Sequence, residues 1–238
     1  MFNNKTIAVI GAMDCETELI KDFLTDVENV ASSCFDICLG KAGKNIIIIA
    51  KSGVGKVAAS CCTQYIINEF EPDFIINTGV AGGVGKGLNI GDIVIAESFI
   101  QHDFDASALG YAKGYICNGI ENQKPTVFYS DKKLVEKMET AALKTLSKES
   151  VHIGRIVSGD TFVATVEKKA ELKKLFNATA AEMESAAIAH SCSLNNIPCV
   201  AIRAISDLAD GTKIENYPEF EIKTAQISAQ IIKNLLSK

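Results

Sequence analysis

Short runs of β-branched residues alternate with longer segments of helical periodicity along almost all of the 238 residues. Alternation of this kind predicts an α/β fold with a largely parallel sheet, because helices that connect parallel strands cover the sheet faces. The expected strands are Thr6–Ile10, Phe35–Leu39, Asn45–Ala50, Phe74–Asn77, Asp92–Glu97, His152–Val157 and Cys199–Ile205. The expected helices are 54–70, Glu16–Leu24, Lys133–Leu146, Glu184–Leu194 and Ile222–Leu236.

Composition narrows the class of protein. Hydrophobic residues make up 47% and charged residues 22%, as in ordinary globular chains, and the net charge is −5. A negative chain has no basic field for nucleic acid or an anionic membrane surface, and the longest aliphatic run, Ile46–Ala50, is far too short for a membrane span. Eight cysteines without a CxxC pair, and no signal peptide, predict free thiols in the cytoplasm. No linker interrupts the chain, so we expect one domain over residues 1–238.

Glycines and acidic residues follow several of the expected strands. In an open parallel sheet the ligand site lies beyond the carboxyl ends of the strands. The segments there are 11–16, 52–56, 78–83, 158–163 and 206–207. We expect them to meet in one pocket that combines glycine-lined backbone, carboxylates and an aromatic surface.

Each acidic residue also has a simpler interpretation. Glu16 is placed to complement the positive end of a helix dipole, and Asp207 to cap a helix N-terminus. Glu182 and Glu184 are compatible with a solvated helix face. The three histidines do not have metal-ligand spacing, so the sequence predicts no metal site.

Two glycine-rich segments resemble nucleotide-binding motifs only in part. Residues 53–58 fit the G-x-G-x-x-G/A dinucleotide pattern between a strand and a helix, which raises a dehydrogenase as a hypothesis. That pattern requires an acidic residue at the end of the next strand, where this chain has Asn77-Thr78. Residues 79–87 fail the phosphate-loop pattern at two positions, so neither motif is complete.

Six motifs together are more informative than any one of them. They are Ile10-Gly11-Ala12-Met13 with Glu16, Ser52-Gly53-Val54-Gly55-Lys56, Asn77-Thr78-Gly79-Val80-Ala81-Gly82-Gly83, Ser158-Gly159-Asp160, Glu182-Met183-Glu184 and Arg203-Ala204-Ile205-Ser206-Asp207. In this order they resemble the 5′-methylthioadenosine/S-adenosylhomocysteine nucleosidases of the nucleoside phosphorylase superfamily, over almost the full chain. The resemblance implies a single-domain, three-layer α/β/α fold around a mixed, largely parallel sheet.

The resemblance also implies roles for individual residues. Asp207 corresponds to the general acid that protonates adenine at N7, and Glu16 to the base that activates the attacking water. This chemistry needs a protonated Asp207 and an ionised Glu16 in the substrate complex. The implied substrate-binding residues are Val54, Ala81, Gly82, Phe162, Val163, Glu182, Met183, Glu184, Arg203, Ser206 and Tyr217.

Within this set, the resemblance assigns each residue to adenine, to the attacking water or to the sugar. Ser206 would orient Asp207, Phe162 would stack on adenine, and the backbone near Val163 would read the edge of the base. Glu182 and Arg203 would hold the water and the catalytic carboxylate in place. Glu184 would bind the ribose hydroxyls and Met183 would pack on the sugar. The implied ligand is a small-molecule nucleoside, and no cofactor is implied.

Two positions depart from the family pattern. Val80 stands where some relatives have serine, and Tyr217 where they have phenylalanine. The aperiodic segment 101–125 corresponds to the family's subunit contact, so the resemblance implies a homodimer in which Leu109, Tyr111 and Cys117 reach the neighbouring pocket.

Other functions share this scaffold. Purine nucleoside phosphorylases and AMP nucleosidases usually gather several arginines around phosphate, whereas this chain has only Arg155 and Arg203. A futalosine-type hydrolase would use the same acids on a different nucleoside. A non-catalytic nucleoside-binding protein would not need both an acid and a base.

Overall fold

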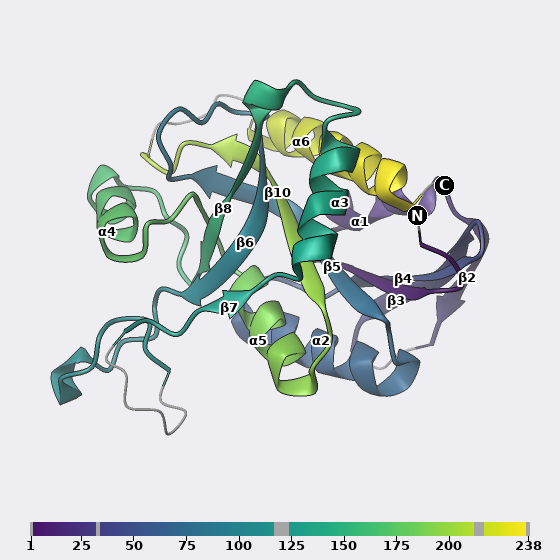
Figure 1. Ribbon diagram of the computed structural model, residues 1–238, viewed down its shortest axis with the longest axis horizontal. Helices are drawn as coiled ribbons and strands as arrows, with labels where there is room; N and C mark the ends of the chain where they lie inside the picture. The colour runs from purple at the N-terminus through teal and green to yellow at the C-terminus, as the bar shows by residue number, and fades with distance from the viewer. Residues whose placement is uncertain (1, 32–33, 117–123, 212–216, 237–238) are drawn as a thin grey trace.

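Ten strands form one mixed sheet in the part of the chain that the computed structural model describes (Figure 1). The model describes residues 2–31, 34–116, 124–211 and 217–236, of which 217–224 are described by their backbone alone. The strands are β1 (Thr6–Gly11), β2 (Thr25–Val30), β3 (Asp36–Ala42), β4 (Asn45–Lys51), β5 (Phe74–Gly83), β6 (Ile93–Gln101), β7 (Phe128–Tyr129), β8 (Val151–Ser158), β9 (Ala180–Glu182) and β10 (Cys199–Asp207).

The sheet combines a parallel centre with antiparallel additions. Parallel pairings join β1 to β4 and β5, β5 to β10, and β8 to β6 and β9. Antiparallel pairings add β3 to β4, β2 to β3, β7 to β6, β10 to β6 and β9 to β5. The strands β5, β10, β6, β8 and β9 therefore close a ring of pairings, and this ring brings the ends of distant strands together.

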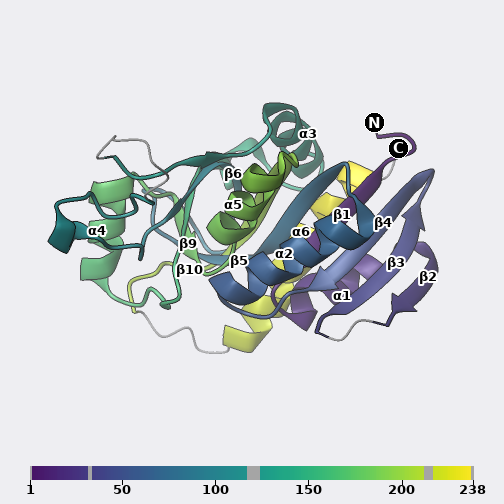
Figure 2. The same cartoon turned by 90° about the horizontal axis from the view of Figure 1, so that it is seen from below.

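Helices cover both faces of the sheet. They are α1 (Asp14–Lys21), α2 (Lys56–Phe70), α3 (Lys132–Ala142), α4 (Val166–Phe176), α5 (Ser185–Asn195) and α6 (Tyr217–Leu236). Helices α2 and α5 pack together on one face, and α1, α3 and α6 lie on the other (Figures 1 and 2). Helix α4 lies beside β8 at one end of the molecule (Figure 1). In the described part of the chain, no helix has both the length and the apolar character needed to cross a membrane.

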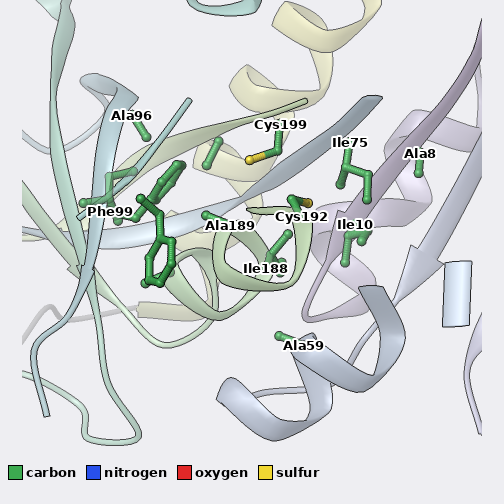
Figure 3. Packing of buried hydrophobic residues seen from close by; sticks show 14 of the residues in the cluster. Ala8, Ile10, Ala59, Ile75, Ala96, Phe99, Ile188, Ala189, Cys192 and Cys199 are labelled. Atoms are coloured by element: carbon green, nitrogen blue, oxygen red, sulfur yellow. The ribbon is translucent and has the colours of Figure 1, made fainter. Parts of the chain in front are cut away.

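Side chains of the central strands alternate between two apolar cores. On β1, Ala8 and Ile10 belong to the core beneath α2 and α5, whereas Ile7 and Val9 belong to the core beneath α1, α3 and α6. Figure 3 shows the first core, in which α2 and α5 contribute Ala59 and Ile188 respectively. Successive strand residues point to opposite faces, so a strand covered on both faces is apolar at every position.

The predicted α/β fold with a mixed sheet is confirmed, and the differences lie in elements with weak apolar signals. The edge strand β2 is mostly exposed, and β7 and β9 have two and three residues, so none carries a readable alternation. Helix α4 buries only Leu172 and Phe176. The segment 78–83, expected as a loop after a strand, continues β5 to Gly83 because β10 and β9 pair with it there.

Candidate active site

One pocket lies where six segments meet, at the carboxyl ends of β1, β4, β5, β8, β9 and β10. Its open volume, with the solvent space at the mouth included, is about 700 Å³. The lining residues are Ala12, Met13, Glu16, Val54, Val80, Ala81, Gly82, Thr161, Phe162, Val163, Ala181, Glu182, Met183, Glu184, Ser206 and Asp207.

The predicted site residues lie in this pocket with two exceptions. Arg203 is buried behind the lining, at 2% exposure. Tyr217 is the first residue of α6, and its side chain lies outside the described residues, as does Cys117. Phe162 and Val54 are 62% and 54% exposed. They give the pocket an apolar rim.

Glu16 enters the pocket from the first turn of α1. Its Oε2 accepts hydrogen bonds from the N–H groups of Ala12 (2.6 Å) and Met13 (3.1 Å), and its Oε1 accepts one from Val80 (3.2 Å). Glu16 thus does complement the helix N-terminus, but it also reaches β5. Burial raises its pKa, although Arg203 and the three N–H groups act in the opposite direction. A raised pKa makes the carboxylate a stronger base.

Gly79 makes room for this carboxylate. A Cβ at residue 79 would lie 2.5 Å from Glu16 Oε1 and 3.3 Å from Arg203 Cζ. Any larger residue would therefore displace Glu16. Gly79 and Gly82 thus allow close packing between the strand and the carboxylates of Glu16 and Asp207.

Asp207 is the last residue of β10 and is paired in register with Gly82 of β5. Its Oδ1 accepts the N–H of Ala209 (2.7 Å), and its Oδ2 accepts the hydroxyl of Ser206 (3.0 Å). The bond to a residue two positions ahead marks a turn, and in residues 208–211 no helix follows, so the helix-cap alternative is wrong. Glu16 contacts Val80 and Asp207 pairs with Gly82. The two carboxyl residues therefore meet β5 at positions two residues apart, a rise of about 7 Å along the strand.

Glu182 and Glu184 are buried, so the solvated-face alternative is wrong. Glu182 Oε2 accepts Arg203 Nη2 (2.7 Å) and the N–H groups of Glu184 (3.0 Å) and Ser185 (2.9 Å), while Ser158 donates to Oε1. Burial would raise the pKa of Glu182, but Arg203 and these donors hold it below its ordinary value.

Glu184 has the opposite electrostatic surroundings. Its Oε1 accepts one N–H, from Gly55 at 2.8 Å. Burial first, and then repulsion from Glu182, raise its pKa to about 7. Two carboxyls that are separated by one residue in the sequence therefore differ in their affinity for a proton, because only Glu182 contacts the arginine.

Several site residues were not predicted as individual contacts. Ala12, Met13, Val80 and Thr161 line the pocket and belong to segments expected there, Val80 also as a departure from the family pattern, whereas Ala181 was not singled out. Their adjacency to Glu16, Ala81, Phe162 and Glu182 was the available signal. In the ranges that the structure describes, no three His, Cys, Asp or Glu side chains are grouped to hold a metal ion.

Comparison with known proteins identifies the family. A model described as the phosphorylase superfamily matches residues 6–237. The 5′-methylthioadenosine/S-adenosylhomocysteine nucleosidase of Staphylococcus aureus (strain Newman) is 39% identical over 233 residues, which are 98% of this chain and 99% of that protein.

Solved structures of similar proteins support this assignment to the superfamily. The 5′-methylthioadenosine/S-adenosylhomocysteine nucleosidase of Neisseria meningitidis, in complex with methylthio-immucillin-A, is 43% identical with a TM-score of 0.89 over 97% of this chain and 98% of that one. A futalosine hydrolase of Helicobacter pylori is 31% identical with a TM-score of 0.89 over 98% and 97%. This chain therefore belongs to the phosphorylase superfamily and, within it, to the 5′-methylthioadenosine/S-adenosylhomocysteine nucleosidase family.

Proposed function

We propose that this protein hydrolyses the N-glycosidic bond of 5′-methylthioadenosine and S-adenosylhomocysteine, releasing adenine and the corresponding thioribose. The observation that carries the proposal is the meeting of Glu16 and Asp207 in one pocket, although they lie near opposite ends of the chain. Hydrolysis of an N-glycoside needs a proton for the leaving base and a water for the cationic sugar, and two separate carboxyls can supply both.

Asp207 is the proposed general acid. Hydrogen bonds from Ser206 and Ala209 engage both of its oxygens and fix the carboxyl plane at the end of β10. Protonation of adenine N7 by Asp207 makes the base a neutral leaving group, so the glycosidic electrons pass to the purine. The exposed ring of Phe162 offers an apolar face for stacking, and the backbone near Val163 reads the edge of the base.

Glu16 is the proposed base. It takes a proton from water as the water oxygen bonds to the anomeric carbon of the oxocarbenium-like sugar. Buried Arg203 stabilises the charge on Glu16 and Glu182, and Glu182 fixes the segment that carries Met183 and Glu184. Glu184 accepts from the ribose hydroxyls, and Met183 packs on the sugar.

Water is favoured over phosphate as the nucleophile because the pocket offers no cation to a phosphate. Arg155 is committed elsewhere, with Nε donating to Ser98 Oγ (3.0 Å) and Nη1 to the Phe176 carbonyl (2.7 Å). Arg203 pairs with Glu182. Among the described residues that line the pocket there is no lysine or arginine. Both phosphorolysis and AMP binding need such a group.

The test is to incubate the protein with 5′-methylthioadenosine with and without phosphate and to identify the sugar. Free methylthioribose in both samples supports the hydrolase. A sugar phosphate formed only with phosphate would support a phosphorylase, and binding without adenine release would support a nucleoside-binding protein. Faster turnover of futalosine than of 5′-methylthioadenosine would favour the futalosine alternative.

We further infer that the chain acts as one domain, assembles as a homodimer and works in the cytoplasm. Leu109 is 78% exposed and Tyr111 is 37% exposed, and both follow β6 in the segment expected to contact a second subunit. Contact with a second subunit would remove these apolar side chains from water. Light scattering that gives the mass of a single chain at micromolar concentration would contradict the dimer.

A further inference from the structure

A closed ring of hydrogen bonds joins three charged residues outside the pocket lining through side chains and backbone N–H groups. Lys56 Nζ donates to Asp103 Oδ1 (2.7 Å), the N–H of Asp160 donates to Asp103 Oδ2 (2.8 Å), and the N–H of Lys56 donates to Asp160 Oδ1 (2.8 Å). The ring ties the start of α2 to the segments that follow β6 and β8. These segments are distant in the sequence, so the ring is a tertiary feature.

The ion pair in this ring is partly shielded from water. The side chains of Lys56 and Asp103 are 17% and 24% exposed, whereas those of the Lys41 and Asp26 pair are 57% and 63% exposed. Burial would raise the pKa of Asp103, but the hydrogen bonds from Lys56 and Asp160 lower it. A shielded pair loses less of its Coulomb energy to solvent than a surface pair, so it holds its geometry more firmly.

The ring lies next to the backbone N–H group that donates to Glu184. Gly55 precedes Lys56 and has a φ of +97°, a conformation that favours glycine. A Cβ at residue 55 would lie 3.1 Å from Asp160 Oδ1. The N–H of Gly55 is the donor to Glu184 Oε1 at 2.8 Å. A loosened ring would therefore move the only N–H that this carboxylate oxygen accepts among the described residues.

The ring also anchors one wall of the pocket. Asp160 leads directly into Thr161, Phe162 and Val163, which line it. The ring thus connects Gly55, whose N–H donates to Glu184, with the pocket wall that contains Phe162.

We propose that Lys56, Asp103 and Asp160 are positioning residues that hold the Gly55 N–H against Glu184 and so set the enzyme's selectivity for the ribose hydroxyls. The inference rests on the proposed function, because it takes Glu184 as the group that accepts from those hydroxyls. A carboxylate whose orientation is fixed by a supporting hydrogen bond binds a hydroxyl at one defined place. Without that support the Glu184 carboxyl loses its fixed orientation.

The experiment compares kcat/KM for 5′-methylthioadenosine and for its 2′-deoxy and 3′-deoxy analogues, in wild type and in Lys56→Met. The ratio between parent and deoxy substrate measures hydroxyl selectivity. The intrinsic effect of each hydroxyl on the glycosidic bond is the same for both enzymes and cancels. We expect the selectivity ratio to fall about fivefold in Lys56→Met for at least one hydroxyl, roughly the worth of one hydrogen bond.

Lys56→Arg keeps the charge and should keep the ratio, and Lys41→Met is the matched control for losing a lysine from an exposed ion pair. Asp103→Asn, which keeps the size of the side chain but not its charge, should lower the ratio as Lys56→Met does and replaces it if that variant is unfolded. A folded Lys56→Met or Asp103→Asn with the wild-type ratio would overturn the inference, even if kcat/KM fell for all substrates. Wild type that releases no adenine would instead overturn the proposed function, and the inference with it.

Discussion

Arg203 Nη2 lies 2.7 Å from Glu182 Oε2, and both side chains are almost fully buried, at 2% and 4% exposure. The same nitrogen donates to Asn77 Oδ1 at 2.5 Å. Arg203 lowers the pKa values of Glu16, Glu182 and Glu184, so one cation acts on three carboxyls. At Glu182 the attraction of Arg203, with hydrogen bonds from Ser158, Ser185 and Arg203, outweighs burial and lowers the pKa, whereas at Glu16 and Glu184 burial outweighs the attraction and the pKa is raised.

The Arg203–Glu182 pair should be important for stability. Arg203→Met leaves Glu182 buried without its cation, and breaking a buried pair from one side typically lowers the free energy of unfolding by about 3–5 kcal/mol. Urea unfolding of wild type and variant measures this loss. Lys41→Met, which breaks an exposed pair, should unfold like wild type; equal losses in the two variants would contradict the prediction.

Asp207→Asn tests the proposed general acid. The amide keeps the size of the side chain but cannot donate the acid proton, so we expect kcat/KM for 5′-methylthioadenosine to fall by about 10²-fold or more. A coupled assay that detects adenine measures the rate of its release. Asp26→Asn removes an exposed acid far from the pocket and serves as the control. Wild-type turnover in Asp207→Asn would remove this residue from the mechanism.

Glu16→Gln tests the proposed base. The glutamine still accepts hydrogen bonds through its carbonyl oxygen but cannot take a proton from water, so kcat should fall by about 10²-fold or more while the KM changes less. Glu18 belongs to the same helix and has a side chain that is 57% exposed, and Glu18→Gln is therefore a matched control with the expected wild-type rate. A larger effect on KM than on kcat would indicate a binding role instead.

The raised pKa of Glu184 predicts a dependence of stability on pH. Between its ordinary value of 4.5 and about 7, the folded protein binds more protons at this carboxyl than the unfolded chain does. Its contribution to the free energy of unfolding therefore falls as the pH rises through that window. Glu184→Gln removes this contribution, so relative to wild type the variant should gain on the order of 2 kcal/mol between pH 5 and pH 8.

Urea unfolding of both proteins at each pH measures the difference, with Glu18→Gln as the control for losing an exposed glutamate. A stability difference between Glu184→Gln and wild type that does not change with pH would mean that Glu184 has an ordinary pKa in the folded state.

The strength of the local signal decided which elements could be predicted. Strand β4 contains four consecutive isoleucines, and α2 buries one face, so both were evident in the sequence. Strand β9 has three residues and exists because β5 and β8 pair with it. The extension of β5 to Gly83 depends on the same neighbours.

For the candidate site, the order of motifs along the chain was enough to predict which residues could do chemistry, because glycines and acids follow apolar strands whose carboxyl ends share one edge of a sheet. The differences between these residues depend on their surroundings in the folded protein. Glu182 and Glu184 are alike in the sequence, but Arg203 contacts Glu182, whereas burial and then repulsion from Glu182 raise the pKa of Glu184. Lys56, Asp103 and Asp160 have no local pattern that connects them. Strand register and helix packing bring them together, and these are set by contacts between residues that are far apart in the chain.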